Sequence, residues 1–390
     1  MNQDQLTLLD ALVVPYDLEL RAMRRDIHTY PELARDEHRT TRVVADRLSQ
    51  AGLTPHRLPG TGLTCDIGDG RPRIALRADM DALSVRDEKD VPYRSQVDGV
   101  AHCCGHDMHT VIALGAGLVL NDLHRAASLT GAVRLVFQPA EEATPGGALD
   151  VLASGALEGV DRILGLHCDP RHDVGEVGVR VGSITGSADE IRVRISGPGG
   201  HTARPHLTAD VVYALAKVVA DVPAVLSRRV DPRASLSVVW GQIFAGRASN
   251  AIPEVGEAAG TVRALDVRAW QEAPKIIEDA IRGVAAPYDV RVDVTYTRGV
   301  APVVNEPISA GLLEAAALAT GADVHEAEQS LGGEDFGWYL QQMDGAMGRL
   351  GVRTPGGPTH DLHQGHFDAD EDAIAVGVKV LAGAALLALT

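Results

Sequence analysis

The sequence predicts an α/β fold in which a mostly parallel, helix-covered sheet is interrupted by a small inserted α+β domain. Across residues 72–167, short apolar runs alternate with helical stretches, as in parallel strands joined by helices. Across 190–297 the order changes to β-α-β-β-α-β, that of a split-βαβ, ferredoxin-like sandwich. Because 390 residues exceed the size of a single hydrophobic core, we expect two domains.

Apolar periodicity places the individual elements. The segments expected to be strands of the main domain are 73–78, 133–137, 162–167 and 346–350. Its expected helices include 107–123 and 372–389. In the inserted domain the expected strands are 190–196, 235–244, 257–265 and 291–296, and the expected helices are 209–226 and 268–285. The main domain is therefore predicted to comprise residues 1–186 and 300–390, and the inserted domain residues 187–299.

Charge and composition exclude several classes of protein. With 36 Lys and Arg against 53 Asp and Glu, the net charge of −17 repels nucleic acid and anionic lipid, so neither partner is expected. Residues 1–9 are polar and acidic, unlike a signal peptide, and no stretch of 18 apolar residues predicts a membrane span. Four unevenly placed cysteines do not suggest a disulfide framework. We expect a cytoplasmic protein with free thiols.

Metal-binding residue types are densest at 102–109, His-Cys-Cys-Gly-His-Asp-Met-His. The composition predicts roughly 0.3 histidines in such a window, and this one holds three. Thiolate and imidazole are preferred zinc ligands, and Cys104 and His106, separated by one residue at a strand-to-helix turn, can face one ion. The alternative is a buried thiol and histidines that make ordinary hydrogen bonds where a helix begins.

Two further segments place candidate residues at strand ends. Glu141 and Glu142 directly follow the strand 133–137, where one carboxylate could bind metal and the other take a proton from water. Out of context, such a pair is more often a solvated loop that caps a helix. His167 ends the apolar run 163–166, although a single histidine there is more often a core residue than a ligand.

A fourth candidate ligand lies near the C-terminus, where His363 stands between His360 and His366, and spacing cannot choose among the three. Asp79 and Asp81 end another strand and could orient a ligand histidine or cap a turn. The inserted domain adds polar residues in glycine-rich or strand-end settings, each of which could equally be surface: His201, Arg204, Asn250 and Arg263.

These motifs, in this order along the chain, resemble those of the aminoacylase and carboxypeptidase superfamily of dimetal hydrolases. The likeness is to its amidohydrolase branch, which includes hippurate hydrolase and the plant indole-acetyl-amino-acid hydrolases. Its most compact motif is Cys104-Gly105-His106-Asp107. The other matching segments are 24–28, 31–33, 76–83, 138–142, 165–167, 200–201, 204–206, 250–253, 260–263, 333–336, 362–363 and 367–368. The resemblance covers nearly the whole chain.

The resemblance implies roles for individual residues. The implied metal ligands are Cys104, His106, Glu142, His167 and His363, with Glu141 as general base. Cysteine at 104, where peptidase relatives carry aspartate, points to the amidohydrolase branch. An inserted lid domain that often mediates dimers is also implied, with His201 reaching toward a neighbouring active site. The chain departs from the family pattern at Cys103, Met108, Cys168 and 143–147 without losing a ligand.

The expected function is metal-dependent hydrolysis of the amide bond in N-acyl-amino acids, yielding a carboxylic acid and a free amino acid. Two divalent ions, Zn, Mn, Co or Ni, are expected per subunit, with Glu141 and His201 as catalytic residues. Asn250 would help to hold the oxyanion, and Arg263 or Arg204 with Asn250 would hold the substrate carboxylate. A homodimer or homotetramer is expected.

Three other functions compete with this one. A dipeptidase or carboxypeptidase could use the same metal centre on a peptide bond. A catalytically silent metal- or ligand-binding protein could keep the fold, although the candidate base and all five implied ligands are present. A thiol redox protein using Cys103 and Cys104 is least favoured, because adjacent cysteines form strained disulfides.

Overall fold

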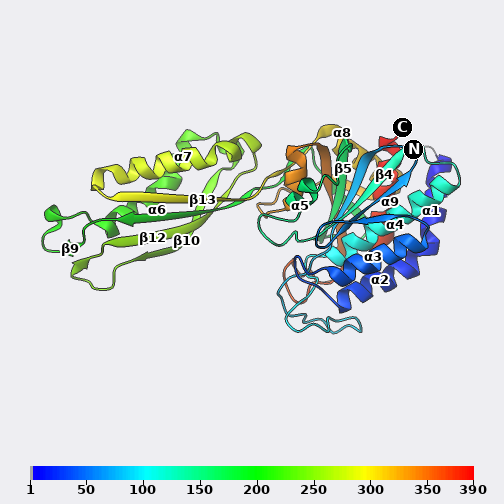
Figure 1. Cartoon of the computed structure of the whole chain (residues 1–390), viewed down its shortest axis with the longest axis horizontal. Coiled ribbons are helices and arrows are strands. Elements are labelled where there is room, and N and C mark those ends of the chain that lie inside the picture. Colours follow the sequence, from blue (N-terminus) through cyan, green and yellow to red (C-terminus); the bar gives the residue numbers. More distant parts are fainter. Residues whose placement is uncertain (1–2) are drawn as a thin grey trace. The chain divides into compact units, whose positions relative to one another are not determined.

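The computed structural model describes residues 3–390 and divides into two compact units, each of which packs helices on a sheet (Figure 1). The first unit comprises residues up to Ile184, Asn305–Glu328 and Trp338–Thr390. The second comprises Thr185–Val304 and Gln329–Gly337. The sequence had assigned 329–337 to the main domain, so this boundary differs from the expected one. The first two residues of the predicted main domain lie outside the described residues.

The first unit is built on an eight-stranded sheet in the order β1-β2-β4-β3-β5-β16-β6-β15. Its strands are β1 (Pro55–Arg57), β2 (Leu63–Gly68), β3 (Pro72–Asp79), β4 (Ala132–Gln138), β5 (Arg162–Asp173), β6 (Glu176–Val179), β15 (Asp323–Glu326) and β16 (Asp344–Arg353). The pairs β4–β3, β3–β5, β5–β16 and β6–β15 are parallel. The pairs β1–β2, β2–β4 and β16–β6 are antiparallel. The predicted α/β class with a mostly parallel sheet is confirmed.

Helices cover this sheet through apolar faces that share one core. They are α1 (Gln3–Val13), α2 (Asp17–Thr29), α3 (His38–Gln50), α4 (His106–Arg125), α5 (Ala148–Ala153), α8 (Pro307–Ala319) and α9 (Asp372–Ala388). Helix α4 packs against α9 and β3, and almost all of its residues are buried. A Cβ at Gly115 would lie 2.6 Å from Val378 Cγ2, and one at Gly117 would lie 2.3 Å from Leu135 Cδ1. These two glycines therefore allow the middle of α4 to pack closely against α9 and β4.

The second unit has the predicted β-α-β-β-α-β order. Its sheet, β10-β12-β8-β13, is antiparallel throughout. These strands are β8 (Ala188–Ser196), β10 (Ser237–Ala245), β12 (Val255–Arg263) and β13 (Arg291–Val300), and the helices are α6 (Val211–Arg229) and α7 (Val267–Ala285). Side chains alternate between buried and exposed along β8, so its inward face joins the core beneath α6 and α7. Asp210 and Asp266 cap the two helices, each accepting a backbone N–H.

Two pairs of short strands lie outside these two sheets. β9 (Gly200–His201) pairs with β11 (Ala251–Ile252), and β7 (Gly182–Thr185) pairs with β14 (Val303–Asn305). Within residues 3–390, no helix combines the length and apolar character needed to span a bilayer.

Candidate metal centre

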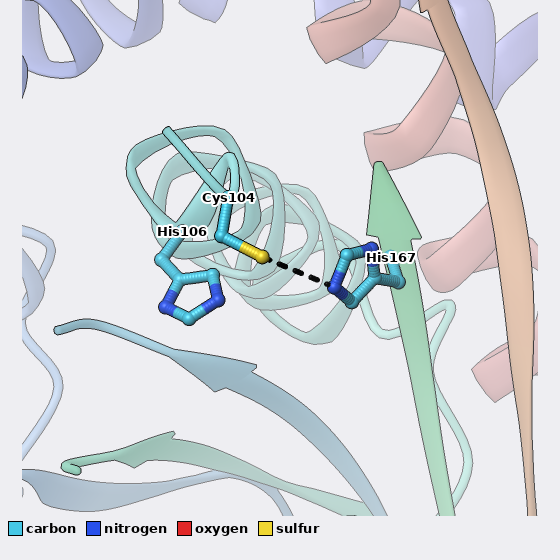
Figure 2. A group of neighbouring side chains, drawn as sticks. All are labelled: Cys104, His106 and His167. Atoms are coloured by element: carbon cyan, nitrogen blue, oxygen red, sulfur yellow. Dashed lines mark hydrogen bonds between the residues drawn. The ribbon is translucent and has the colours of Figure 1, made fainter. Parts of the chain in front are cut away.

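Three side chains that the sequence singled out converge where β5 and the start of α4 meet. Figure 2 shows Cys104 just before α4, His106 as its first residue, and His167 on β5. The potential ligand atoms of the three residues lie within 4.8 Å of one another, and Cys104 Sγ is 3.7 Å from His167 Nε2. All three side chains are buried. The structure thus brings together a thiol and two imidazoles from two elements of the first unit.

The turn into α4 depends on the glycine between Cys104 and His106. Gly105 has φ 85°, in the left-handed region that favours glycine. A Cβ there would also lie 2.8 Å from Cys168 Sγ. Its carbonyl accepts the backbone N–H groups of Met108 and His109 at 2.9 and 3.0 Å, which starts the helix. Gly105 therefore lets residues 104 and 106 face the same space.

Backbone carbonyls set the tautomers of the two histidines. His106 Nδ1 lies 2.8 Å from the carbonyl oxygen of Asp81, and His167 Nδ1 lies 2.8 Å from that of Cys168. Because a carbonyl oxygen can only accept, each Nδ1 carries a proton, and each Nε2 keeps its lone pair when the ring is neutral, as it is in a metal ligand. His106 Nε2 is buried without a hydrogen-bond partner. A buried, unpartnered lone pair is what a metal ion would satisfy.

A second group shares the same thiol. The potential ligand atoms of Cys104, Glu142 and His363 also lie within 4.8 Å of one another, and His363 Nε2 is 3.4 Å from Glu142 Oε1. His363 has φ 63°, and its backbone N–H donates to the Cys103 carbonyl at 2.8 Å. Of its two rivals, His366 instead contacts Glu88 at 3.0 Å and stacks with His360. Cys104 therefore belongs to two overlapping groups.

The electrostatics of the pocket suit a bound cation. Burial raises the pKa of the Cys104 thiol well above its ordinary value, and nearby Glu142 adds to the shift. Burial, reinforced by the charge of Arg349, lowers the pKa of His167, so its imidazole is neutral, as a ligand must be. Burial also opposes the charge of His106, but Asp79 and Cys104 outweigh it and raise that pKa. Glu142 beside Cys104 and Asp79 beside His106 are negative charges that a bound divalent ion would offset.

The types of ligand atom in the pocket also suit a divalent cation. One thiolate, three imidazoles and one carboxylate are ligands that zinc and similar ions accept. The residues present therefore fit a metal centre of the zinc type.

Asp81 holds the loop that carries both glutamates. Its carboxylate accepts the backbone N–H groups of Glu141 at 3.0 Å and Glu142 at 2.9 Å, while its carbonyl orients His106. The sequence left two roles open for Asp81, a carboxylate that orients a ligand histidine or a cap of a turn. In the structure, its carbonyl contacts His106 Nδ1 at 2.8 Å, and its carboxylate lies 3.4 Å from the same nitrogen while it accepts the two glutamate N–H groups.

Asp79 makes different contacts from those of Asp81. Its carboxylate accepts from Arg77 at 2.7 Å and pairs with His109 Nδ1 at 2.6 Å. Burial opposes its ionisation, but Arg77, His106 and His109 hold its pKa well below the ordinary value. His109 Nε2 accepts the backbone N–H of Cys168 at 2.8 Å, so both of its ring nitrogens are engaged. His109 thus supports the pocket and leaves no nitrogen for an ion.

Replacement of Asp81 by alanine should weaken metal binding and activity together. The change leaves two backbone N–H groups beside the pocket without their acceptor and frees the segment that carries Glu141 and Glu142. Because partners that position metal ligands typically contribute about 10- to 100-fold, we expect a loss of that size in metal affinity or turnover. Competition with a chromophoric chelator measures the affinity. Replacement of the exposed Asp98 by alanine serves as the control, and equal affinities in the two variants would contradict the role of Asp81.

A buried ionic network behind the centre had no role in the sequence interpretation. Asp107 accepts from Arg24 Nε at 2.7 Å and pairs with His28 Nδ1 at 2.7 Å, and Arg24 also donates to Asp368 at 2.7 Å. Burial opposes ionisation of Asp107, but Arg24 and His28 hold its pKa well below the ordinary value. Because Asp107 follows His106, this network fixes the first turn of α4. The matching segments 24–28, 104–107 and 367–368 were the available sign of it.

The remaining candidates, which lie in the second unit, are His201, Arg204, Asn250 and Arg263. His201 on β9 pairs with Ala251 on β11, and the backbone N–H of Thr202 donates to the Asn250 carbonyl at 3.3 Å. His201 and Asn250 are thus held on adjacent, exposed segments, and Arg204 is exposed nearby in sequence. Arg263 ends β12 and donates to the Leu331 carbonyl at 3.0 Å. Burial lowers the pKa of Arg263.

Known proteins are similar in sequence to this chain across nearly its whole length. The model of the peptidase family M20/M25/M40 matches residues 75–387. An N-acetylcysteine deacetylase of Bacillus subtilis is 35% identical, covering 94% of this chain and 96% of the relative. A thermostable carboxypeptidase 1 of Saccharolobus solfataricus is 32% identical, covering 91% of each chain.

One relative is much longer than this chain. A Rhodococcus jostii protein named as a glutamate–cysteine ligase is 49% identical over 362 residues, which is 92% of this chain. The chain spans only 45% of that relative, whose name therefore describes a longer protein.

A solved structure shares the fold and part of the sequence. It is a Bacillus subtilis protein described as a dinuclear metal binding peptidase from the M20 family, with a TM-score of 0.85 and 32% identity. The match covers 96% of this chain and 99% of the other. Taken with the match over residues 75–387, these likenesses show that the chain belongs to the peptidase family M20/M25/M40.

Proposed function

We propose that this family member is a metal-dependent amidohydrolase that cleaves N-acyl-amino acids into a carboxylic acid and a free amino acid. The observation that carries the proposal is the position of Glu141. Its carboxylate lies with the potential ligand atoms of His106 and Glu142, all within 4.8 Å of one another. A carboxylate beside a metal pocket, on a loop held by Asp81, is suited to move a proton to or from water.

The proposed cofactor is a pair of divalent ions, Zn, Mn, Co or Ni. Two overlapping ligand groups support a pair, as does a relative described as dinuclear. The proposed ligands are Cys104, His106, Glu142, His167 and His363. Bound ions would supply Lewis acidity toward the scissile carbonyl and toward water.

The chain's own residues would carry the proton steps and hold the substrate. Glu141 accepts the proton of the attacking water and delivers it to the leaving nitrogen, so that the amine departs neutral. His201 is proposed as a second catalytic residue that stabilises the oxyanion together with Asn250. Arg263 or Arg204 is proposed, with Asn250, to hold the free carboxylate, because a guanidinium binds carboxylates through two hydrogen bonds. These last roles rest on the sequence.

Acyl-amino acids are favoured over peptides because Cys104 stands where peptidase relatives carry aspartate. A deacetylase at 35% identity over almost the full chain supports the same choice. The carboxypeptidase at 32% identity supports the alternative, cleavage of a peptide bond, and the assay of acyl-amino acids beside dipeptides distinguishes the two. A catalytically silent metal-binding protein would bind metal in this pocket and hydrolyse none of the substrates.

A substrate panel tests the proposal. The purified, metal-loaded protein is assayed with N-acetyl-, N-benzoyl- and long-chain acyl-amino acids, with dipeptides, and with N-acetyl-amino-acid amides that lack the free carboxylate. We expect acyl-amino acids to be cleaved fastest and the amides to show a raised KM, because an arginine would lose its partner. Preference for dipeptides would replace the proposal with a peptidase. No hydrolysis of any substrate would favour the silent binding protein.

We also propose that the chain forms a homodimer or homotetramer in the cytoplasm. Val239 and Phe244 on the edge strand β10 are 62% and 69% exposed and lie on the same face of the sheet, an apolar surface suited to a second copy. All four cysteines are free thiols, in keeping with a reducing compartment. Light scattering of the purified chain and cell fractionation would check these two proposals.

A further inference from the structure

A second group of potential metal ligands lies at the far edge of the large sheet. His172 is near the end of β5, Glu176 begins β6, and His325 lies on the edge strand β15. Their potential ligand atoms are within 4.8 Å of one another. Along β5, His172 is five residues beyond His167, roughly 16 Å for an extended strand. The group shares no residue with the centre around Cys104.

Glu176 contacts one ring nitrogen of the nearer imidazole, that of His172. Its Oε2 lies 3.1 Å from His172 Nδ1 and also accepts the backbone N–H of Asp173 at 3.2 Å. A carboxylate accepts the Nδ1 proton, which leaves the Nε2 lone pair of His172 free. A carboxylate behind a histidine in this way is a common arrangement at metal sites, because it fixes the ring and raises its basicity.

The second imidazole presents its own Nε2 to that lone pair. His325 Nε2 is 3.3 Å from His172 Nε2, and the ring centroids are 4.1 Å apart. Two nitrogens bound tetrahedrally at about 2.0–2.1 Å from one zinc ion would be about 3.3–3.4 Å apart. The observed separation therefore needs little change for one ion to bind both. Burial, together with neighbouring His172, lowers the pKa of His325 and favours its neutral form.

The backbone around the group is already ordered. Gly175, with φ 97°, makes the turn between β5 and β6, and its carbonyl accepts the N–H of Asp323 at 2.8 Å. His325 pairs with Gly178 across β15 and β6, and a Cβ on Gly178 would lie 3.0 Å from His325 Nε2. The missing side chain at 178 leaves room for the ring. The side chains of His172 and Glu176 are 22% and 35% exposed, so an ion can reach them from solvent.

We propose that His172 and His325 bind one further divalent transition-metal ion through their Nε2 atoms, with Glu176 orienting His172. Zinc, nickel and copper suit two imidazoles, and water would complete the coordination shell. Without the ion, a His325 ring that carries its proton on Nε2 can donate it to His172 Nε2, which lies 3.3 Å away. When the ion binds Nε2, solvent carries that proton to Nδ1, so that the ring stays neutral. The ion would join the edge strand β15 to the turn that links β5 and β6, two segments 153 residues apart in sequence.

Zinc counting on matched variants tests the site. The metal-loaded protein is dialysed against a fixed free Zn²⁺ concentration, and zinc per chain is measured by elemental analysis. His325→Gln removes a ligand while keeping a hydrogen-bond donor. His56→Gln changes an exposed histidine on β1, at the opposite edge of the sheet, and is the control. We expect wild type and His56→Gln to hold about one zinc more than His325→Gln, with equal hydrolytic activity in all three.

Equal zinc in wild type and His325→Gln would overturn the site. So would an equal loss in His56→Gln, because surface imidazoles in general would then bind the extra ion. If His325→Gln does not fold, Glu176→Gln decides. It keeps both imidazoles and should weaken the extra zinc about 10- to 100-fold, as loss of an orienting carboxylate does elsewhere. An unchanged affinity for that zinc would contradict the proposal.

Discussion

Replacement of Glu141 by glutamine is expected to lower turnover about 10²- to 10⁴-fold while the metal content stays at the wild-type level. Glutamine has nearly the same size and keeps the backbone N–H that Asp81 accepts at 3.0 Å. It cannot accept a proton at neutral pH, so the step that activates water is lost. Because Glu142 is the proposed metal ligand and Glu141 is not, metal binding should not change.

Elemental analysis and the rate of amino acid release, measured on one preparation, check both parts. Replacement of the exposed Glu158 by glutamine is a charge-matched control and should behave as wild type. Near-full activity in Glu141→Gln with metal bound would remove Glu141 from its proposed role. Loss of metal from this variant would make Glu141 a ligand and leave the base unassigned.

Replacement of Cys104 by alanine should remove both metal ions of the centre around Cys104 and leave the ion proposed at His172 and His325 in place. Cys104 is the residue that the two ligand groups have in common, so its loss takes one ligand from each group. Activity should then fall to the background rate. Cys103 is the matched control, because it is an equally buried, adjacent thiol whose Sγ contacts the Ala101 carbonyl at 3.7 Å. Cys103→Ala should retain two ions and activity.

Two histidine variants refine the same test. His167 belongs with Cys104 and His106, whereas His363 belongs with Cys104 and Glu142. At the centre around Cys104, His167→Ala and His363→Ala should therefore each retain about one ion, whereas Cys104→Ala retains none there. Two retained ions in Cys104→Ala would show that the thiol is not shared, and loss of metal from Cys103→Ala would show that the neighbouring thiol takes part.

Regular hydrophobic patterns made much of the fold predictable. β8 was visible because its side chains alternate, and α4 because its apolar stretch is long. The strands β1, β6 and β15 were missed because each has three or four residues, too few for a period to show. β2, which has six residues, was also not expected, and its antiparallel pairing with β4 depends on tertiary structure.

Local spacing explains which parts of the candidate site were predictable. Cys104 and His106 are separated by one glycine, so their proximity could be inferred from the sequence alone. The choice of His363 over His360 and His366 depends on a left-handed residue and a hydrogen bond to Cys103, which spacing does not encode. The contact between His172 and His325 joins residues 153 positions apart and gives no sequence pattern.

The roles of Asp81 and His109 could not be predicted from the sequence, because both depend on hydrogen bonds. Asp81 acts through both its carboxylate and its carbonyl, and a residue type does not reveal main-chain contacts. His109 has the same chemistry as His106 and lies one helical turn away, but its two nitrogens are occupied by Asp79 and Cys168. Only hydrogen-bond geometry separates the supporting residue from the candidate ligand.

Metal reconstitution followed by assay of an N-acetyl-amino acid tests the proposed reaction most directly. The protein is stripped with a chelator, divalent ion is returned in steps, and the free amino acid is measured beside a matched dipeptide. We predict no release without metal, a rise to a maximum at two ions bound by the centre around Cys104, and preference for the acyl-amino acid. Full activity in the stripped protein, or cleavage of the dipeptide while the acyl-amino acid stays intact, would contradict the proposed function.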